Sequence, residues 1–320
     1  MNHKDMKKAI KFSVLTLLCL IVLSSVGGYF YFKRQFKAPP NQLTITGTNT
    51  TLPIWWVGTA QSERGAMLLP VQLGSVADTF YMQLDFGAVN TMLYAPAIAS
   101  IAEHNPKSVV PGPWVKEVGL TVGKVQIWGD SVRSIDFGTP VEWDSDKPQI
   151  IGTLGADVLE RCPMLVDFVE GTVHFLPQVP DSLHAHTNTI AFTMEERRVM
   201  VPVQLQGEER KMIWDTGSSA FQLLTNQRSW QKLAINPEDV EPTASNQRRR
   251  PLLVYTAACQ ETLRLGQTQL PLTQVTYIEG FPWYQTLLYR FSGMGGMLGN
   301  AIFAKRKVFL NANSGELVVF

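Results

Sequence analysis

The stretch KMIWDTGSS, residues 211–219, decides the fold, because it sets one aspartate between an apolar strand and a glycine turn. A second stretch, YMQLDFGA at residues 81–88, has the same form, with its aspartate 130 residues before the first. In both stretches a glycine stands two places after the acid, which fits a tight turn that needs positive φ or close backbone approach. We therefore expect Asp85 and Asp215 to lie at the tips of two equivalent loops.

The repeat extends beyond the two aspartates, and internal repeats of this kind define architecture before single motifs do. Three further pairs of blocks match in the same order: LPVQL (69–73) with VPVQL (201–205), LTVGKVQI (120–127) with LRLGQTQL (263–270), and GTLGADVL (152–159) with GMLGNAIF (296–303). The central glycines lie 143 residues apart and the last blocks 144, so the additional residues of the second copy fall between Asp215 and Gly266. We infer the duplication of an all-β unit.

Composition agrees with an all-β protein of one or two domains. The 320 residues include 24 glycines and 19 prolines, and short runs of Val, Ile, Leu and Thr lie between them. The net charge of +1 gives no reason to expect nucleic acid as a partner. We interpret the one triplet of arginines, Arg248–Arg250, as part of a solvated polar loop.

The N-terminal region predicts a membrane anchor. Residues 12–32 are an apolar run of 21 residues, and a membrane-spanning helix needs roughly 20. Basic residues flank the run on both sides, and a helix near the start with a basic leader usually leaves the N-terminus in the cytoplasm. No clear small-x-small cleavage site follows, which favours a retained signal-anchor. We expect a cytoplasmic leader at 1–11, one inner-membrane helix at 12–32, a tether at 33–53, and a body in the periplasm or at the cell exterior.

Several other residues have simpler interpretations than catalysis. Cys162 and Cys259 occur one per copy, and we favour two buried free thiols over a disulfide. His184 and His186 lie in a Pro-rich segment between the copies without an obvious third ligand, so an exposed pair is favoured over a metal site.

Two further aspartates and one tripeptide also have simpler interpretations. Asp157 and Asp167 are not matched by acids in the second copy, which favours turn and capping roles. Asp85-Phe-Gly87 is also the metal-binding tripeptide of protein kinases. The chain has no phosphate-binding glycine loop, strand lysine or His-Arg-Asp loop to accompany it, so a kinase is not indicated.

The motifs together resemble those of the aspartic peptidases. The sequence DTGSS at 215–219, followed by Met297-Leu-Gly299, resembles one lobe, and DFGA at 85–88, followed by IGTLGAD at 151–157, resembles a diverged second lobe. The resemblance covers about residues 65–320. It implies a two-lobed, pepsin-like arrangement of retropepsin-like units with a cleft between them. The expected lobes are 54–180 and 181–320, which we call the first copy and the second copy.

The resemblance implies that Asp85 and Asp215 form a catalytic pair. Two carboxylates about 3 Å apart cannot both ionise, so the pair shares a proton and activates a water between them. The residues expected to support the two loops are Gly87, Ala88, Thr216, Gly217 and Ser218. No metal or organic cofactor is required. The expected function is an endopeptidase for extended peptides or unfolded protein, with apolar side chains beside the cut and a monomeric catalytic unit.

The two loops differ in one donor. Ser218 can donate a hydrogen bond to Asp215, whereas Ala88, at the matching place, cannot do so for Asp85. Hydrogen bonds to the charged form favour that form. We therefore expect Asp215 to be the more acidic member, and Asp85 to be the one that keeps the proton.

The chain departs from the family pattern in two places. Phe86 stands where the family has Thr or Ser, whose hydroxyls form a crossed grip between the two loops; Thr216 keeps its half. The stretch 109–115 lacks the usual flap tyrosine and offers Trp114 as a candidate flap residue. These departures motivate a rival, a non-catalytic protein that binds extended peptides. A third alternative, a membrane-tethered interaction module, predicts that neither aspartate matters.

Overall fold

A computed structural model describes residues 37–59, 62–183, 186–245, 252–280 and 295–320, together with the single helical positions Leu20, Ser24, Gly27 and Gly28. The chain divides into two compact units, 1–40 and 41–320. The predicted leader and nearly all of the predicted membrane helix lie outside the described residues. Within the described parts, no helix is long and apolar enough to cross a membrane.

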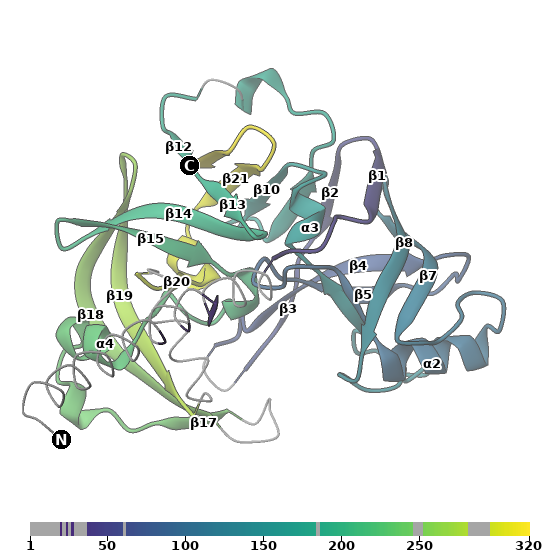
Figure 1. Cartoon of the computed structure of the whole chain (residues 1–320), viewed down its shortest axis with the longest axis horizontal. Helices are drawn as coiled ribbons and strands as arrows, with labels where there is room; N and C mark the ends of the chain where they lie inside the picture. The colour runs from purple at the N-terminus through teal and green to yellow at the C-terminus, as the bar shows by residue number, and fades with distance from the viewer. Residues whose placement is uncertain are drawn as a thin grey trace, which may run out of the picture. The chain divides into compact units, whose positions relative to one another are not determined.

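The described strands form three sheets, so the all-β prediction is confirmed (Figure 1). The first sheet has the order β1-β8-β6-β9-β5-β4-β3, and β7 pairs with both β4 and β8, which curls the sheet into a barrel-like form. Its strands are β1 (Leu43–Gly47), β3 (Trp55–Val57), β4 (Ala66–Leu73), β5 (Phe80–Leu84), β6 (Met92–Tyr94), β7 (Trp114–Val122), β8 (Val125–Ile135) and β9 (Ile150–Leu154).

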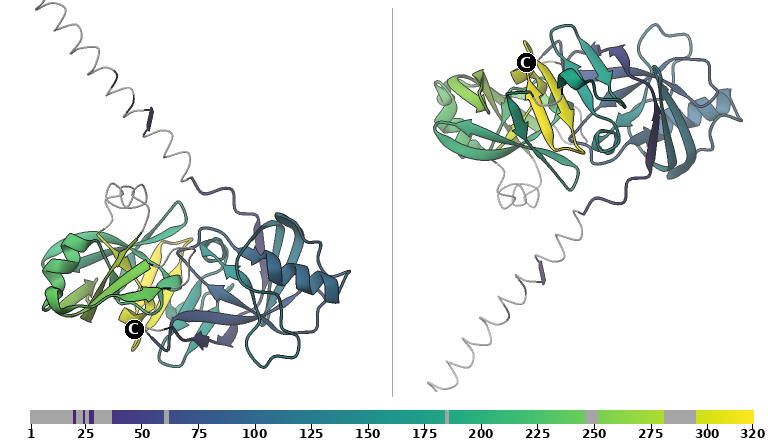
Figure 2. Two further views of the ribbon diagram at one scale, coloured as in Figure 1. Left: turned by 90° about the horizontal axis from the view of Figure 1, so that it is seen from below. Right: turned by 90° about the horizontal axis from the view of Figure 1, so that it is seen from above.

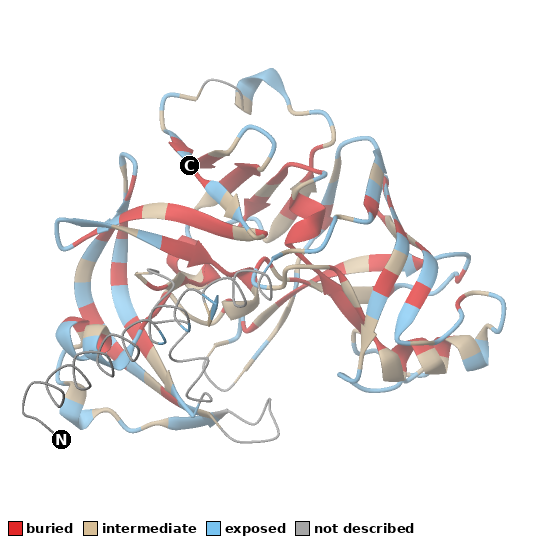
Figure 3. Ribbon diagram, viewed as in Figure 1, coloured by how far each residue is buried: buried red, intermediate tan, exposed pale blue. Residues whose placement is uncertain are grey.

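The second sheet repeats this plan with the order β13-β14-β15-β20-β16-β19-β18-β17, closed by a pairing of β14 with β18. Its strands are β13 (Thr193–Glu195), β14 (Arg198–Leu205), β15 (Glu208–Trp214), β16 (Leu223–Leu224), β17 (Thr243–Ser245), β18 (Leu252–Leu265), β19 (Thr268–Glu279) and β20 (Met297–Leu298). Buried and exposed positions alternate along the long strand β18, as expected for a sheet with one face on the core (Figure 3).

The third sheet joins the two copies. Its order is β12-β22-β21-β10-β11-β2, built from β2 (Thr50–Pro53), β10 (Met164–Asp167), β11 (Thr172–Phe175), β12 (Thr189–Ala191), β21 (Lys307–Asn311) and β22 (Glu316–Val319). Antiparallel β10 and β21 meet with Leu165 opposite Phe309, and these two residues are themselves 144 apart, the offset of the repeat. Because each is the other's counterpart, the pairing is symmetric about this point. Both views of Figure 2 show the yellow C-terminal strands between the strands of the two copies.

Short helices complete each copy. The described helices are α2 (Ala95–His104), α3 (Ala156–Leu159) and α4 (Gln227–Leu233), with 3-10 turns η1 (Asp181–Leu183), η2 (Thr216–Ser218), η3 (Pro237–Asp239) and η4 (Asn300–Phe303). Helix α2 has a proline, Pro96, as its second residue, which the first turn tolerates, and it buries Ala97, Ile98 and Ile101. Helix α4 is capped by Asn226, whose side chain accepts a hydrogen bond from the Ser229 N–H.

The predicted tether is shorter than expected at its C-terminal end. Residues 43–53, which we assigned to a tether over 33–53, contain β1 and β2. Strand β1 pairs with β8 and buries Leu43, while β2 pairs with β11 and buries Leu52. The many Thr residues of this stretch suggested a linker, but each strand places a leucine in the core, Leu43 from β1 and Leu52 from β2.

The two cysteines of the body are free and buried, as predicted. Burial raises the pKa of the Cys162 thiol to about 11, so it stays protonated at neutral pH. His186 packs edge-on against the ring of Phe320, and His184 lies outside the described residues. Within the described ranges, no group of three or more His, Cys, Asp or Glu side chains is placed to hold a metal ion.

Candidate active site

The two aspartates occupy equivalent places in the two copies. Strand β9 runs parallel to β5 and β20 runs parallel to β15, with Leu154 and Leu298 opposite the last residues of β5 and β15. The Asp85 N–H then donates to the Leu154 carbonyl at 3.0 Å, and the Asp215 N–H donates to the Leu298 carbonyl at 2.9 Å. The repeated Leu-Gly blocks of the sequence therefore fix the backbone at both acids.

The glycines of each loop lie against the carboxylate of the other copy. A Cβ added to Gly87 would lie 2.4 Å from Oδ1 of Asp215, and one added to Gly217 would lie 2.5 Å from Oδ1 of Asp85. Neither space admits a side chain. The two loops are thus interlocked with their acids face to face, and close approach rather than positive φ is what demands glycine here.

The Asp85 carboxyl group is held by backbone donors. Its Oδ1 accepts hydrogen bonds from the N–H groups of Gly87 at 2.8 Å and Ala88 at 3.2 Å. Burial, the charge of Asp215 and a side-chain hydrogen bond with Asp215 together raise the pKa of Asp85 to about 7, against the lowering effect of the two N–H donors. Asp85 therefore has the environment of a carboxyl group that keeps its proton near neutral pH.

The Asp215 carboxylate has the additional donor that its sequence context predicted. Its Oδ1 accepts from the Gly217 N–H at 2.8 Å, and its Oδ2 accepts from the Ser218 hydroxyl at 2.8 Å. Asp215 is buried, and Ala88 offers only its backbone N–H at the matching place. The predicted difference in hydrogen bonding between the two loops is confirmed.

Half of the grip between the loops is present. The buried Thr216 hydroxyl donates to the Leu84 carbonyl at 2.9 Å and accepts from the Phe86 N–H at 2.8 Å. One side chain of the second copy thus pairs two backbone groups of the first copy. Phe86 has no hydroxyl with which to reciprocate.

Aromatic packing stands where the second hydroxyl of the grip between the two loops would lie. Phe86 is fully buried, and its ring meets Trp214 of the other copy edge-on, with centroids 5.7 Å apart. Trp214 also packs against Phe303 at 5.0 Å and Phe168 at 6.5 Å. Edge-to-face aromatic pairs at these distances are favourable. The two loops are therefore joined by a buried apolar contact as well as by the Thr216 hydroxyl.

Asn300 supports the loop that carries Asp215, and the sequence analysis did not predict this role. Its Nδ2 donates to the Thr216 carbonyl at 3.2 Å and to Ser219 Oγ at 2.7 Å, and its Oδ1 accepts from the Trp214 indole at 3.0 Å. The repeat marks this position but not its role, because Asn300 directly follows Gly299 of the GMLGN block, which matches Gly155 in the first copy. Only the fold reveals that this position lies beneath the loop.

Asp167 has the turn role that we predicted, whereas the carboxylate of Asp157 bonds to Thr91, 66 residues earlier, instead of forming a turn or a cap. Asp167 accepts from the N–H groups of Val169 and Glu170 in a turn, and it pairs with Lys307 at 2.7 Å. Asp157 is buried and accepts from both the N–H and the hydroxyl of Thr91.

Trp114 stands at the first residue of β7, opposite Arg133, with 55 % of its surface exposed. The loop before it, residues 105–113, contains no strand. Its role as a flap remains a prediction. Arg248–Arg250 lie between β17 and β18, outside the described residues.

A separate shallow pocket of about 230 Å³ lies at the start of β5, the end opposite to Asp85. Trp55, Tyr81 and Trp143 line part of it, beside the loop 141–149. It does not include either aspartate.

No protein-family model matches the chain, and no curated protein is significantly similar to it.

Proposed function

We propose that the protein is an aspartic endopeptidase in which Asp85 and Asp215 form the catalytic pair. The observation that carries the proposal is the interlocking of the two loops, in which each glycine lies against the carboxylate of the other copy. The raised pKa of Asp85 adds to it, because an acid–base pair needs one protonated and one ionised member at the working pH.

The mechanism follows from the different hydrogen bonding of the two acids. Asp215, with the Ser218 hydroxyl on its outer oxygen, is the ionised member and takes a proton from a water held between the two carboxyl groups. Asp85 holds the shared proton and donates it toward the peptide carbonyl oxygen as the water attacks the carbon. In the resulting tetrahedral diol the C–N bond breaks as Asp215 gives its proton to the amine nitrogen and Asp85 takes back a proton from a diol hydroxyl. The products are a carboxylic acid and an amine, and no covalent enzyme intermediate forms.

The substrate class is an extended peptide or an unfolded segment with apolar side chains beside the cut, as the family resemblance implies. Both acids belong to one chain, so a monomer supplies the whole site. With the predicted anchor at 12–32, the enzyme would be tethered to the inner membrane and would act in the periplasm or at the cell exterior.

The test uses the full-length chain in detergent micelles with a pool of unstructured peptides between pH 3 and 8. Asp85→Asn and Asp215→Asn should each abolish cleavage, because neither variant can share a proton between two carboxyl groups. Asp78→Asn changes an exposed acid near the end of β5 opposite to Asp85 and should cleave at the wild-type rate. A statine-type mimic of the tetrahedral state should inhibit wild-type cleavage.

The rival function is peptide binding without cleavage, and the one-sided grip at Phe86 is the observation that favours it. The same assay separates the two. Peptide binding by a folded wild-type protein that cleaves nothing at any pH would reject the peptidase and favour the binding protein. If neither aspartate variant altered cleavage or binding, the interaction module would be the remaining candidate.

A further inference from the structure

The two catalytic loops are supported in different ways. In the second copy, Asn300 ties the loop through bonds to Thr216, Ser219 and Trp214. The matching residue of the first copy is Ala156, 144 residues earlier, which has no polar side chain. The loop that carries Asp85 therefore lacks this support, in addition to lacking a hydroxyl at position 86.

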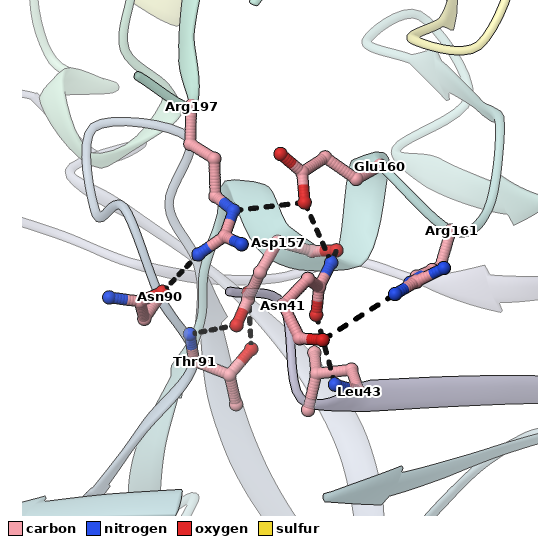
Figure 4. A network of polar contacts seen from close by, with 8 residues as sticks. All are labelled: Asn41, Leu43, Asn90, Thr91, Asp157, Glu160, Arg161 and Arg197. Atoms are coloured by element: carbon pink, nitrogen blue, oxygen red, sulfur yellow. Dashed lines mark hydrogen bonds and ion pairs between the residues drawn. The ribbon is translucent and has the colours of Figure 1, made fainter. Parts of the chain in front are cut away.

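Asp157 supplies part of the missing support. Its two carboxylate oxygens accept from the N–H and the hydroxyl of Thr91, both at 2.8 Å, where the Asp85 loop ends (Figure 4). The Thr91 hydroxyl also accepts from the Gly155 N–H at 3.2 Å. Asp157 is only 5 % exposed, and burial raises the pKa of its carboxyl group, while the Thr91 hydrogen bonds and the charge of Arg197 oppose this effect. A buried carboxylate of this kind needs a counter-charge.

The counter-charge comes from the other copy. Arg197 belongs to the turn between β13 and β14, yet it is only 4 % exposed, which is rare for an arginine. Glu196 and Arg197 form this two-residue turn with φ of 50° and 58°. Such turns ordinarily use Asn or Gly, because positive φ is unfavourable for long side chains. A strained backbone thus directs the guanidinium group into the first copy.

Arg197 contacts both flanks of the Asp85 loop support. One terminal nitrogen donates to the Asn90 side-chain oxygen, next to Thr91, and its Nε lies 2.9 Å from Glu160 Oε2 as an ion pair without the alignment of a hydrogen bond. Glu160 follows α3, the helix that carries Asp157. Figure 4 shows the guanidinium group between Asn90 and Glu160, on the side of Asp157.

We propose that Arg197 is a positioning residue for Asp85. Arg197 belongs to the second copy and holds the loop 85–91 of the first copy through its contacts with Asn90 and Glu160. It does for the first loop part of what Asn300 does for the second. This contact also makes the geometry of the Asp85–Asp215 pair depend on correct docking of the two copies. The inference rests on the proposed function for its kinetic consequence, but the placement of the loop can be measured independently.

The test compares Arg197→Met with Arg210→Met in the full-length chain. Met approximates the length of the side chain and removes its charge. Arg210 is the matched control, because it pairs with the exposed Glu208 at 2.7 Å within the second copy. Arg197→Met should lower kcat by about 10- to 100-fold, since a shift of about 1 Å in a catalytic group can cost this much. KM should stay within about twofold, because the binding surface is unchanged.

Hydrogen exchange provides the readout that does not require activity. In Arg197→Met the amides of Gly87, Ala88 and Thr91 should exchange at least about fivefold faster, while those of residues 215–219 keep their protection. Arg210→Met should alter neither kcat nor exchange at either loop. Asn90→Ala removes only the contact of Arg197 with the loop, and it should reproduce the loss of kcat and of protection in part.

Each result has a defined meaning. If Arg197→Met lowers the melting temperature but leaves kcat and exchange of residues 85–91 at wild-type values, Arg197 only joins the copies and the inference is wrong. If the wild-type protein cleaves nothing, the proposed function fails, and the exchange data alone decide the positioning role. If Arg197→Met does not fold, Arg197→Lys and Asn90→Ala decide it: wild-type kcat and exchange in both would reject the inference.

Discussion

At the scale of single residues, the two acids differ by one hydroxyl group. Ser218 donates to Asp215, and Ala88 leaves the outer oxygen of Asp85 without an equivalent side-chain donor. The pKa of Asp85 is raised to about 7, mainly by burial and by Asp215. Because the mechanism needs Asp85 protonated, activity should persist up to about neutral pH and should fall as pH rises through that pKa.

Ala88→Ser should shift this limit downwards. The new hydroxyl can donate to the Asp85 carboxylate, which favours the charged form and lowers its pKa by about one unit, the equivalent of one hydrogen bond to a charged group. The alkaline limb of the kcat–pH profile should then move to lower pH by a similar amount. Ala99→Ser places the same change on α2 and should leave the profile unchanged. A limb that stays in place in Ala88→Ser would mean that Asp85 is not the group that titrates there.

At the scale of elements, the Thr216 hydroxyl connects the ends of β5 and β15. Thr216→Val keeps the shape of the side chain but leaves the Phe86 N–H and the Leu84 carbonyl without their partner. Each unpaired buried group costs about 1–3 kcal/mol, so the free energy of unfolding should fall by about 2 kcal/mol or more. Urea denaturation measures this loss. Thr121→Val removes an exposed hydrogen bond to Gln126 and should change stability by less than about 0.5 kcal/mol; equal losses in the two variants would contradict the role of the grip.

The sequence predicted some of these elements better than others. The repeat correctly matched β5 with β15 and β9 with β20, because those blocks keep the same apolar and glycine positions in both copies. Residues 43–53 were misread as a tether, since their many Thr residues hide the burial of Leu43 in β1 and Leu52 in β2.

Arg197 could not be identified from the sequence. It lies in the run EERR at 195–198, which is typical of a solvated turn, and only the tertiary fold brings it to Glu160 and Asn90. Asn300 was equally hidden, because a position below a loop has no periodic signature. The contacts of Arg197 depend on how the two copies meet, and those of Asn300 depend on how the second copy folds on itself. One sequence does not contain that information directly.

At the scale of the whole body, residues 41–320, the two copies share the sheet in which β10 pairs with β21. Phe309 is 1 % exposed in this sheet and lies opposite Leu165. Phe309→Ala should lower the free energy of unfolding by about 3–5 kcal/mol, as for other buried aromatic residues. Because the sheet is shared, peptides from both copies should lose hydrogen-exchange protection at the same lowered urea concentration. Val169→Ala, at an exposed position, is the control; separate transitions for the two copies would show that they fold independently.

The central claim is that Asp85 and Asp215 share one proton as a pair. Carboxyl ¹³C NMR of the full-length chain, titrated from pH 3 to 9 in wild type and in Asp215→Asn, tests it most directly. The account predicts that Asp85 titrates with a pKa near 7 in the wild-type protein and that this pKa falls when the charge of Asp215 is removed. An Asp85 resonance that titrates near pH 4 in both proteins would show that the two carboxyl groups do not act together, and the proposed mechanism would be wrong.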